Sequence, residues 1–196
     1  MTTPLAPVTL TGAGVRLEPL SLGHLDALAE VGLDPELWAK SMATVRNRDE
    51  LRLWIERALA DADAGVALPF VTVACASGRA VGSSRFGNYS AADRRIEIGW
   101  TWVAEPWQRS SVNTEAKYLM LQHAFETLGC IRVELKTDAI NLRSRNAILR
   151  IGATEEGILR SHAITEGGRV RDAVMFSILA TEWPAVKERL EAKLRR

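Results

Sequence analysis

A polar stretch, Glu105–Lys117, holds the residues whose types and spacing best fit a defined chemistry. It joins an expected strand at residues 94–103 to an expected helix at residues 114–128, and the first backbone N–H groups of a helix have no intrahelical partner. Those N–H groups and the positive end of the helix dipole favour a phosphate or pyrophosphate group. Further donors are the side chains of Gln108, Arg109, Ser110, Ser111 and Thr114. The stretch therefore indicates an anion site, although a loop with an ordinary N-cap at Asn113 or Thr114 explains the same residues.

Glu97 is the residue best suited to acid–base chemistry, because it interrupts the apolar strand pattern at 94–103. Strand alternation predicts one face with Glu97, Gly99, Thr101 and Val103, and a second face with Ile96, Ile98, Trp100 and Trp102. A carboxylate on a central strand must be paired, hydrated or functional. One interpretation is a salt bridge to Arg85, Arg94 or Arg95. The other is a general base, because most amines are protonated at pH 7 and a carboxylate with a raised pKa can take that proton.

A second polar group begins the expected helix at residues 142–150. In the run Asn141-Leu-Arg-Ser144, an Asn141 N-cap followed by a solvated Ser144 is the simplest local interpretation. The histidines His24, His123 and His162 have no metal-ligand spacing, so we expect no metal site. Cys75 and Cys130 lie in or beside apolar runs and are interpreted as reduced core residues.

These residues must be positioned by a chain of alternating strands and helices. Apolar periodicity predicts strands at 15–20, 70–75, 80–86, 94–103, 131–137, 153–160 and 172–179. It predicts longer helices at 46–62, 114–128, 142–150 and 182–196, after short helical turns that follow Ser21 and Asp34. This order indicates an α/β (α+β) fold in which helices flank both faces of a mixed, mostly antiparallel central sheet.

Composition limits the possible functions. A chain of 196 residues without a Pro-, Gly- or Ser-rich linker fits a single domain, residues 1–196. The formal net charge of +1 gives no reason to expect nucleic acid or an anionic membrane as a partner. The start of the chain does not resemble a secretory signal, and no apolar run is long enough to span a bilayer, so we expect a cytoplasmic protein. Edge strands and the exposed tail make a homodimer plausible.

The polar stretch resembles a known signature. The run Gln108-Arg-Ser-Ser-Val-Asn113 is similar to the pyrophosphate-binding pattern Gln/Arg-x-x-Gly-x-Gly/Ala of the GNAT superfamily of N-acetyltransferases. The longer run from Trp107 to Lys117 resembles the branch that includes bacterial ribosomal-protein alpha-N-acetyltransferases. The order of strands and helices also matches that expected of the GNAT fold over nearly the whole chain. One departure is Ser111, which stands where the family usually has glycine.

The resemblance implies a set of roles. It implies acetyl-CoA as co-substrate, with its pyrophosphate held by Gln108, Arg109, Ser110, Ser111, Val112, Asn113 and Thr114. The backbone of Thr101, Trp102 and Val103 and the side chain of Asn141 would align pantetheine, and Arg143 or Arg145 would pair with phosphates. Glu97 would act as base and contact the acceptor, Ser144 would act as acid or hold a water, and Trp38 would line the acceptor cleft.

The sequence thus predicts an acetyl-CoA-dependent N-acetyltransferase that transfers acetyl directly to a primary amine. The acceptor is expected to be a protein N-terminus or a small molecule, such as an amino acid, polyamine or aminoglycoside. The alternative is a catalytically weak or inactive coenzyme A-binding or regulatory protein on the same fold. This alternative rests on Ser111, since glycine tolerates positive φ and lets a phosphate approach the backbone.

Overall fold

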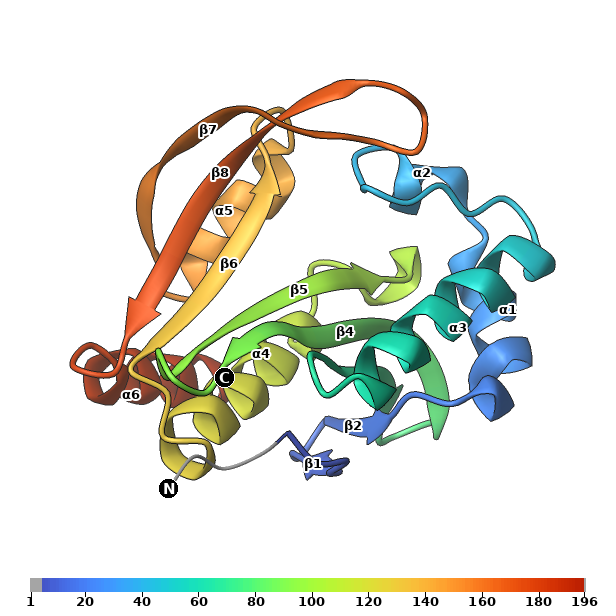
Figure 1. Ribbon diagram of the computed structural model, residues 1–196. Coiled ribbons are helices and arrows are strands. Elements are labelled where there is room, and N and C mark those ends of the chain that lie inside the picture. The colour runs from blue at the N-terminus through green and yellow to red at the C-terminus, as the bar shows by residue number, and fades with distance from the viewer. Residues whose placement is uncertain (1–4, 196) are drawn as a thin grey trace.

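The computed structural model describes residues 5–195, and eight strands in this part of the chain form one sheet (Figure 1). The strand order is β1-β2-β3-β4-β5-β6-β8-β7. All neighbouring strands are antiparallel except β5 and β6, which are parallel. The strands are β1 (Leu10–Thr11), β2 (Val15–Pro19), β3 (Leu68–Ala74), β4 (Arg79–Ser90), β5 (Arg95–Val103), β6 (Arg132–Asp138), β7 (Thr154–Ile164) and β8 (Val170–Leu179). The predicted mixed, mostly antiparallel sheet is therefore confirmed.

Helices cover both faces of this sheet. They are α1 (Leu25–Gly32), α2 (Pro35–Trp38), α3 (Arg48–Asp63), α4 (Val112–Gln122), α5 (Leu142–Arg150) and α6 (Trp183–Leu194). Short 3₁₀ turns lie at Leu22–His24 and Glu105–Trp107, and α4 continues as a π-helical turn at His123–Thr127. One apolar core lies between the sheet and α4, α5 and α6, and a second lies between the sheet and α1, α2 and α3.

Local signals explain the helices that frame the site. In α3, Leu51, Trp54 and Ile55 are buried on one stripe, as the helical period predicts. The bounds of α5 agree with the prediction, and the Asn141 side chain accepts a hydrogen bond from the Ser144 N–H at 3.1 Å, as an N-cap does. Several other boundaries differ from the prediction by a few residues, the usual uncertainty where helices and strands end.

The expected alternation along β5 is wrong beyond Gly99. The pairing of β4 with β5 shifts between Ser83 and Arg85, which places Trp100 and Thr101 opposite one residue of β4. Trp100 has a φ of 49°, a left-handed conformation that is rare for a bulky residue and is found at bulges. Because this bulge reverses the alternation, Trp102 packs in the second core while Ile96 and Ile98 pack in the first.

Candidate active site

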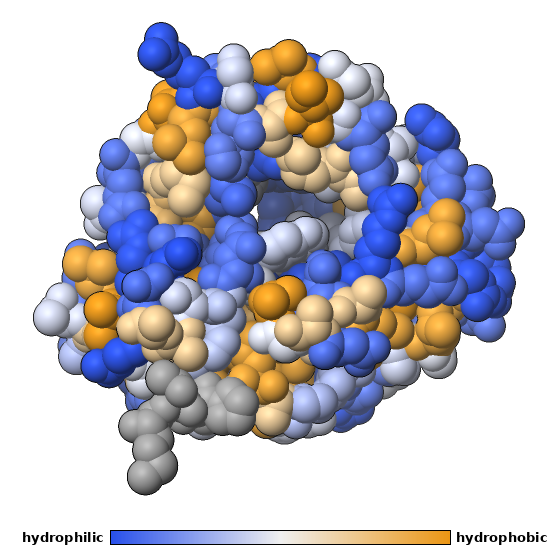
Figure 2. Space-filling model, in the orientation of Figure 1, coloured by the Kyte–Doolittle hydropathy of each residue, from blue (hydrophilic) through white to orange (hydrophobic). Residues whose placement is uncertain are grey.

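The site is built around a split in the sheet. β5 and β6 pair with each other only where Arg95–Glu97 meets Arg132–Glu134, and the two strands do not pair with each other beyond these residues. The two strands diverge beyond this point (Figure 1), and a cavity of about 770 Å³ lies at the split. Figure 2 shows the surface hollowed near the centre of the molecule. β5, the strand that carries Thr101–Val103, separates from β6 directly after Glu97.

Glu97 lies where the split begins and lines the cavity. Its side chain is 6% exposed, and its Oε2 accepts hydrogen bonds from Asn88 Nδ2 at 2.8 Å and Lys136 Nζ at 3.3 Å. The expected arginine partners were wrong, because each has another partner: Arg85 pairs with Asp61, Arg94 donates to the Gly129 carbonyl, and Arg95 pairs with Asp93 and Glu134. Glu97 is therefore a buried carboxylate at the cavity, held by one amide and one ammonium group.

The loop Gln108–Asn113, predicted to bind an anion and called the anion loop below, forms the wall of the cavity next to the start of α4. The helix begins at Val112, two residues earlier than expected. For the N–H groups of Asn113 and Thr114 we find no acceptor among the described residues, as expected in a first helical turn. The Asn113 Oδ1 is buried without a partner among these residues, so the loop also presents an unused acceptor. Gln108, Arg109, Ser110 and Asn113 line the cavity, whereas Ser111, Val112 and Thr114 are not among its lining residues.

Ser111 does not need the conformation that glycine would supply. Its φ of −70° and ψ of −18° are helical, and it serves as the N-cap residue of α4 without a side-chain cap hydrogen bond. The left-handed residue of the loop is Arg109, with a φ of 59°. Backbone strain at Ser111 is therefore absent, and Ser111 differs from glycine only by the space that its Cβ occupies and by the hydroxyl that it adds.

Lys117 on α4 is a cavity residue that the sequence analysis did not single out as a site residue. It is 5% exposed, and its Nζ donates to Ser84 Oγ at 2.9 Å and to Thr101 Oγ1 at 2.5 Å. Burial lowers the pKa of Lys117 to about 7. Helical spacing offered a signal, because Lys117 lies four residues before Leu121 and seven before Ala124, both on the buried face.

The start of α5 forms the side of the cavity opposite β5. Asn141 and Ser144 line the cavity, and Arg143 donates to Gln108 Oε1 at 2.8 Å, which ties α5 to the anion loop. Arg145 does not line the cavity, because its guanidinium bonds to Glu155 at 3.1 Å. The expected phosphate contact is thus available to Arg143 but not to Arg145 in this geometry.

The cavity residues at the start of α4 and on the adjoining side of α5 form what we call the α4 wall. Its charged members have only neutral partners among the described residues. It comprises Gln108, Arg109, Asn113, Lys117, Arg143 and Arg150. Arg150 donates to the Thr114 hydroxyl at 3.1 Å, and Gln108 Nε2 donates to the Val103 carbonyl at 2.8 Å. A wall with cations, free N–H groups and no carboxylate is suited to an anionic ligand.

The opposite side, the α3 wall, has a different character. It comprises Trp38, Trp54, Arg57, Asp61, Arg85, Trp100 and Glu166. The Arg85 guanidinium lies 5.6 Å from the ring centroid of Trp54 and 4.9 Å from that of Trp100, and it pairs with Asp61 at 2.9 Å. Trp100 is 40% exposed, whereas Trp38 is 5% exposed and donates its indole N–H to the Gly32 carbonyl. Trp38, expected to line the acceptor cleft, therefore reaches the cavity but is mainly a core residue.

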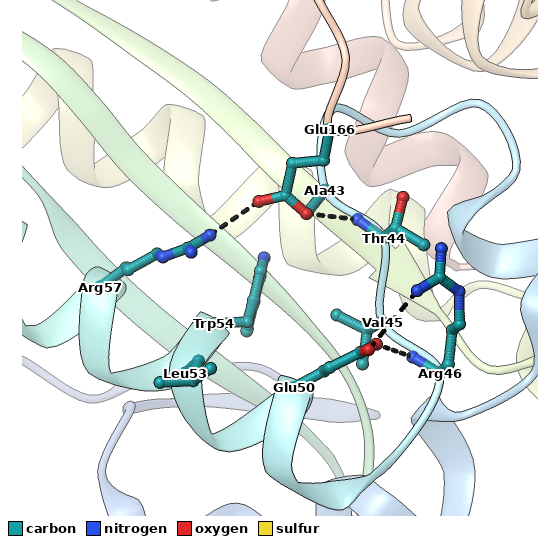
Figure 3. Close-up of a pocket in the computed structure, with 9 residues that line it drawn as sticks. All are labelled: Ala43, Thr44, Val45, Arg46, Glu50, Leu53, Trp54, Arg57 and Glu166. Atoms are coloured by element: carbon teal, nitrogen blue, oxygen red, sulfur yellow. Dashed lines mark hydrogen bonds and ion pairs between the residues drawn. The ribbon is translucent and has the colours of Figure 1, made fainter. Parts of the chain in front are cut away.

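Glu166, in the turn between β7 and β8, connects this hairpin to the α3 wall (Figure 3). Its carboxylate accepts from the Thr44 N–H at 2.8 Å and from Arg57 at 2.7 Å, while its own N–H donates to the Met42 carbonyl at 3.0 Å. The Thr44 N–H, with a smaller contribution from Arg57, holds the pKa of Glu166 below its usual value. These contacts, which we call the Glu166 latch, border a smaller pocket of about 260 Å³ and close one side of the cavity.

Known proteins share this architecture. The acetyltransferase (GNAT) domain family matches residues 15–154. The crystal structure of a GCN5-related N-acetyltransferase from Brucella melitensis is 32% identical, with a TM-score of 0.89 over 97% of this chain and 87% of that one. Mycobacterium smegmatis RimJ in complex with CoA-disulfide is 26% identical, with a TM-score of 0.78 over 99% of this chain and 94% of that one. Bacillus subtilis (strain 168) "Putative ribosomal N-acetyltransferase YdaF" is 33% identical over 100 residues, 51% of this chain and 54% of that protein.

The chain belongs to the GNAT acetyltransferase domain family, because the family match covers most of its length and includes the split sheet and the anion loop. The chain spans about half the length of the curated relatives it matches. In residues 5–195, no group of three or more His, Cys, Asp and Glu side chains is placed to hold a metal ion. No helix in the same range is long and apolar enough to cross a bilayer.

Proposed function

We propose that this protein is an acetyl-CoA-dependent N-acetyltransferase that transfers the acetyl group directly to a primary amine. The observation that carries the proposal is the split between β5 and β6, which has an anion-binding wall on one side and a buried carboxylate, Glu97, at its base. The relative whose structure contains CoA-disulfide has the same fold, which supports coenzyme A as the ligand.

The residues of the α4 wall suit coenzyme A. The unpaired N–H groups at the start of α4, with Gln108, Arg109 and Arg143, would hold the pyrophosphate. The free edge of β5 at Thr101–Val103 would align the pantetheine arm as an added strand does, and Asn141 would support it from α5.

Glu97 and Ser144 would share the proton transfers. When bound, acetyl-CoA supplies the activated acyl group, and the acceptor must present a neutral amine to it. Glu97 is the carboxylate that can take the amine proton, directly or through water, since it lines the cavity between the two walls. Ser144, near the start of α5, also lines the cavity. It would act as acid or hold a water near the sulfur.

For the acceptor we propose the alpha-amine of a protein. One relative supports a protein acceptor, since YdaF is named a putative ribosomal N-acetyltransferase. Charge also favours it over a polyamine or aminoglycoside. Each carboxylate that lines the cavity already has a cationic partner within the chain: Glu97 with Lys136, Asp61 with Arg85, and Glu166 with Arg57. A polycationic acceptor would have to displace these partners.

An inactive coenzyme A-binding relative is less well supported than the sequence implied, since Ser111 adopts an ordinary helical conformation. The test is calorimetric titration with acetyl-CoA and with coenzyme A, followed by an acetylation assay on N-terminal peptides. Micromolar binding and turnover on peptide alpha-amines are expected. Binding without turnover on any amine would favour the regulatory alternative, and no binding would overturn the proposal.

A further inference from the structure

Lys117 has no role in the proposed reaction, although its amine lies at the wall of the same cavity. The residue is in α4, four residues after Asn113, and is 5% exposed. Its Nζ reaches Thr101, an exposed residue on the free part of β5, and Ser84 on β4. Lys117 is therefore placed beneath the strand that is proposed to align the cofactor.

Both partners of the amine are uncharged hydroxyl groups. Ser84 Oγ and Thr101 Oγ1 lie 2.8 Å apart, and Thr101 Oγ1 is 3.2 Å from the Gly99 carbonyl, to which it can donate. The hydroxyls can accept hydrogen bonds from the amine, but they supply no negative charge. A buried ammonium without a counter-charge is costly, and this is why burial lowers the pKa of Lys117.

Charged and titratable groups on the elements around Lys117 are bonded elsewhere. The Glu115 carboxylate accepts from the Gly14 N–H, and Tyr118 donates to Glu191 of α6. Arg85 of β4 pairs with Asp61, Glu97 of β5 with Lys136, Arg150 of α5 with the Thr114 hydroxyl, and Glu126 beyond α4 with Lys187. None of the carboxylates within the described residues bonds to the Lys117 amine, so this part of the chain supplies no counter-charge for its protonated form.

We infer that Lys117 is the charge partner of the anionic cofactor, and that binding of coenzyme A is coupled to uptake of one proton by this amine. The inference rests on the proposed function, which brings coenzyme A to the α4 wall. The step is a proton transfer from the solvent to the neutral Nζ, and no bond to the ligand forms. Linkage makes the effect reciprocal, because the protonated form must then bind coenzyme A more tightly than the neutral form does.

The size of the effect follows from the free amine. With a pKa of about 7, about one-tenth of the free protein carries the proton at pH 8 and about nine-tenths carry it at pH 6. If bound coenzyme A keeps the amine charged, binding should take up about 0.9 proton at pH 8 and about 0.1 proton at pH 6. The affinity should be about tenfold weaker at pH 8 than at pH 6.

The test is calorimetric titration of the full chain with coenzyme A at pH 6, 7 and 8, in two buffers of different ionisation enthalpy. The variant Lys117→Met removes the amine but keeps a long side chain, and Lys117→Gln is a second, polar replacement. Lys40→Met is the matched control, since Lys40 is an exposed lysine that lines the same cavity away from α4. Melting curves establish that each variant folds.

Wild type and Lys40→Met should take up about 0.9 proton more at pH 8 than either Lys117 variant. Protons bound by the ligand's own phosphates contribute equally to every variant, so they cancel in this difference. Equal proton uptake by wild type and both Lys117 variants, with coenzyme A bound, would overturn the inference and leave the proposed function intact. Failure of the wild type to bind coenzyme A at any pH would instead overturn the proposed function.

Discussion

The two walls of the cavity carry similar cations, but the partners of these cations differ. On the α3 wall, Arg57 and Arg85 each pair with a carboxylate of the same chain. On the α4 wall, Lys117 and Arg143 bond only to hydroxyl and amide groups. The cations of the α3 wall are therefore neutralised by carboxylates of the same chain, whereas the positive charge of the α4 wall is uncompensated and can attract an anionic ligand.

This difference indicates how each wall would select its ligand. A wall with uncompensated cations and free N–H groups binds an anion by charge and depends strongly on salt and pH. A wall with internal ion pairs and the aromatic rings of Trp54 and Trp100 selects mainly by shape and by contact with apolar surface. Variants that change one wall should therefore alter one binding step and spare the other.

The largest effect is expected at Glu97, between the two walls. Glu97→Gln keeps the size of the side chain but removes the base, so turnover should fall about 100-fold or more, while coenzyme A affinity changes little. The measurement is the rate of peptide acetylation across pH, with calorimetry for coenzyme A. Glu105→Gln, at an exposed residue near the end of β5, is the control and should match wild type. Unchanged turnover in Glu97→Gln would eliminate Glu97 as the base.

Charge reversal tests whether the α4 wall alone binds the anion. Arg109→Glu should weaken coenzyme A binding about 10- to 100-fold, because a charge-assisted contact to phosphate is replaced by repulsion. Lys40→Glu makes the same charge change away from that wall and should alter affinity less than about threefold. Titration calorimetry at low and high salt measures both. Equal losses in the two variants would mean that the cavity attracts coenzyme A only through its overall charge.

The Glu166 latch should stabilise the α3 wall without affecting cofactor binding. Glu166→Gln weakens the pairing with Arg57 and the hydrogen bond from the Thr44 N–H, so the free energy of unfolding should fall by about 1 kcal/mol at pH 7. Coenzyme A affinity should not change. Chemical denaturation measures the first quantity and calorimetry the second.

The pH dependence of the free energy of unfolding provides a separate test of the Glu166 latch. The pKa of Glu166 is lowered in the folded protein, so its stabilisation is present above the unfolded value of about 4.3 and is lost as the pH falls through the folded value. The gap between wild type and Glu166→Gln should therefore close in acid, whereas Glu36→Gln, at an exposed glutamate, should show no gap at any pH. If the difference in free energy of unfolding between wild type and Glu166→Gln persists in acid, the stabilisation by Glu166 comes from packing and not from its charge.

The smallest effect is expected at Ser111. Ser111→Gly should change coenzyme A affinity by less than about threefold, because the helical φ of −70° gains nothing from glycine. The same titration measures it, with Ser110→Gly, which loses the hydrogen bond from its hydroxyl to the Trp107 carbonyl, as the comparison. A large gain in affinity for Ser111→Gly would show that the Cβ obstructs the phosphate.

Most of the fold was predictable because its signals are local. The α3 stripe and the Asn141 cap of α5 are encoded within a few residues, and both are present as expected. The bulge at Trp100 carried no such signal, so the alternation was extended through Trp102 and placed it on the wrong face. The partner of Glu97 was missed for a related reason, since Lys136 lies on a strand 39 residues away.

The sequence by itself determined which elements form, the polar loop before α4, and a carboxylate inside an apolar strand, because periodicity and capping act over one or two turns. Only the tertiary structure decided which side chains meet. The divergence of β5 from β6 opens the cavity, and it depends on pairing between strands that are distant in the chain. The burial of Lys117 against Ser84 and Thr101, 33 and 16 residues away, follows from the packing of α4 beneath that sheet. Burial and partners set the charge of an amine, so its chemistry is a property of the folded chain.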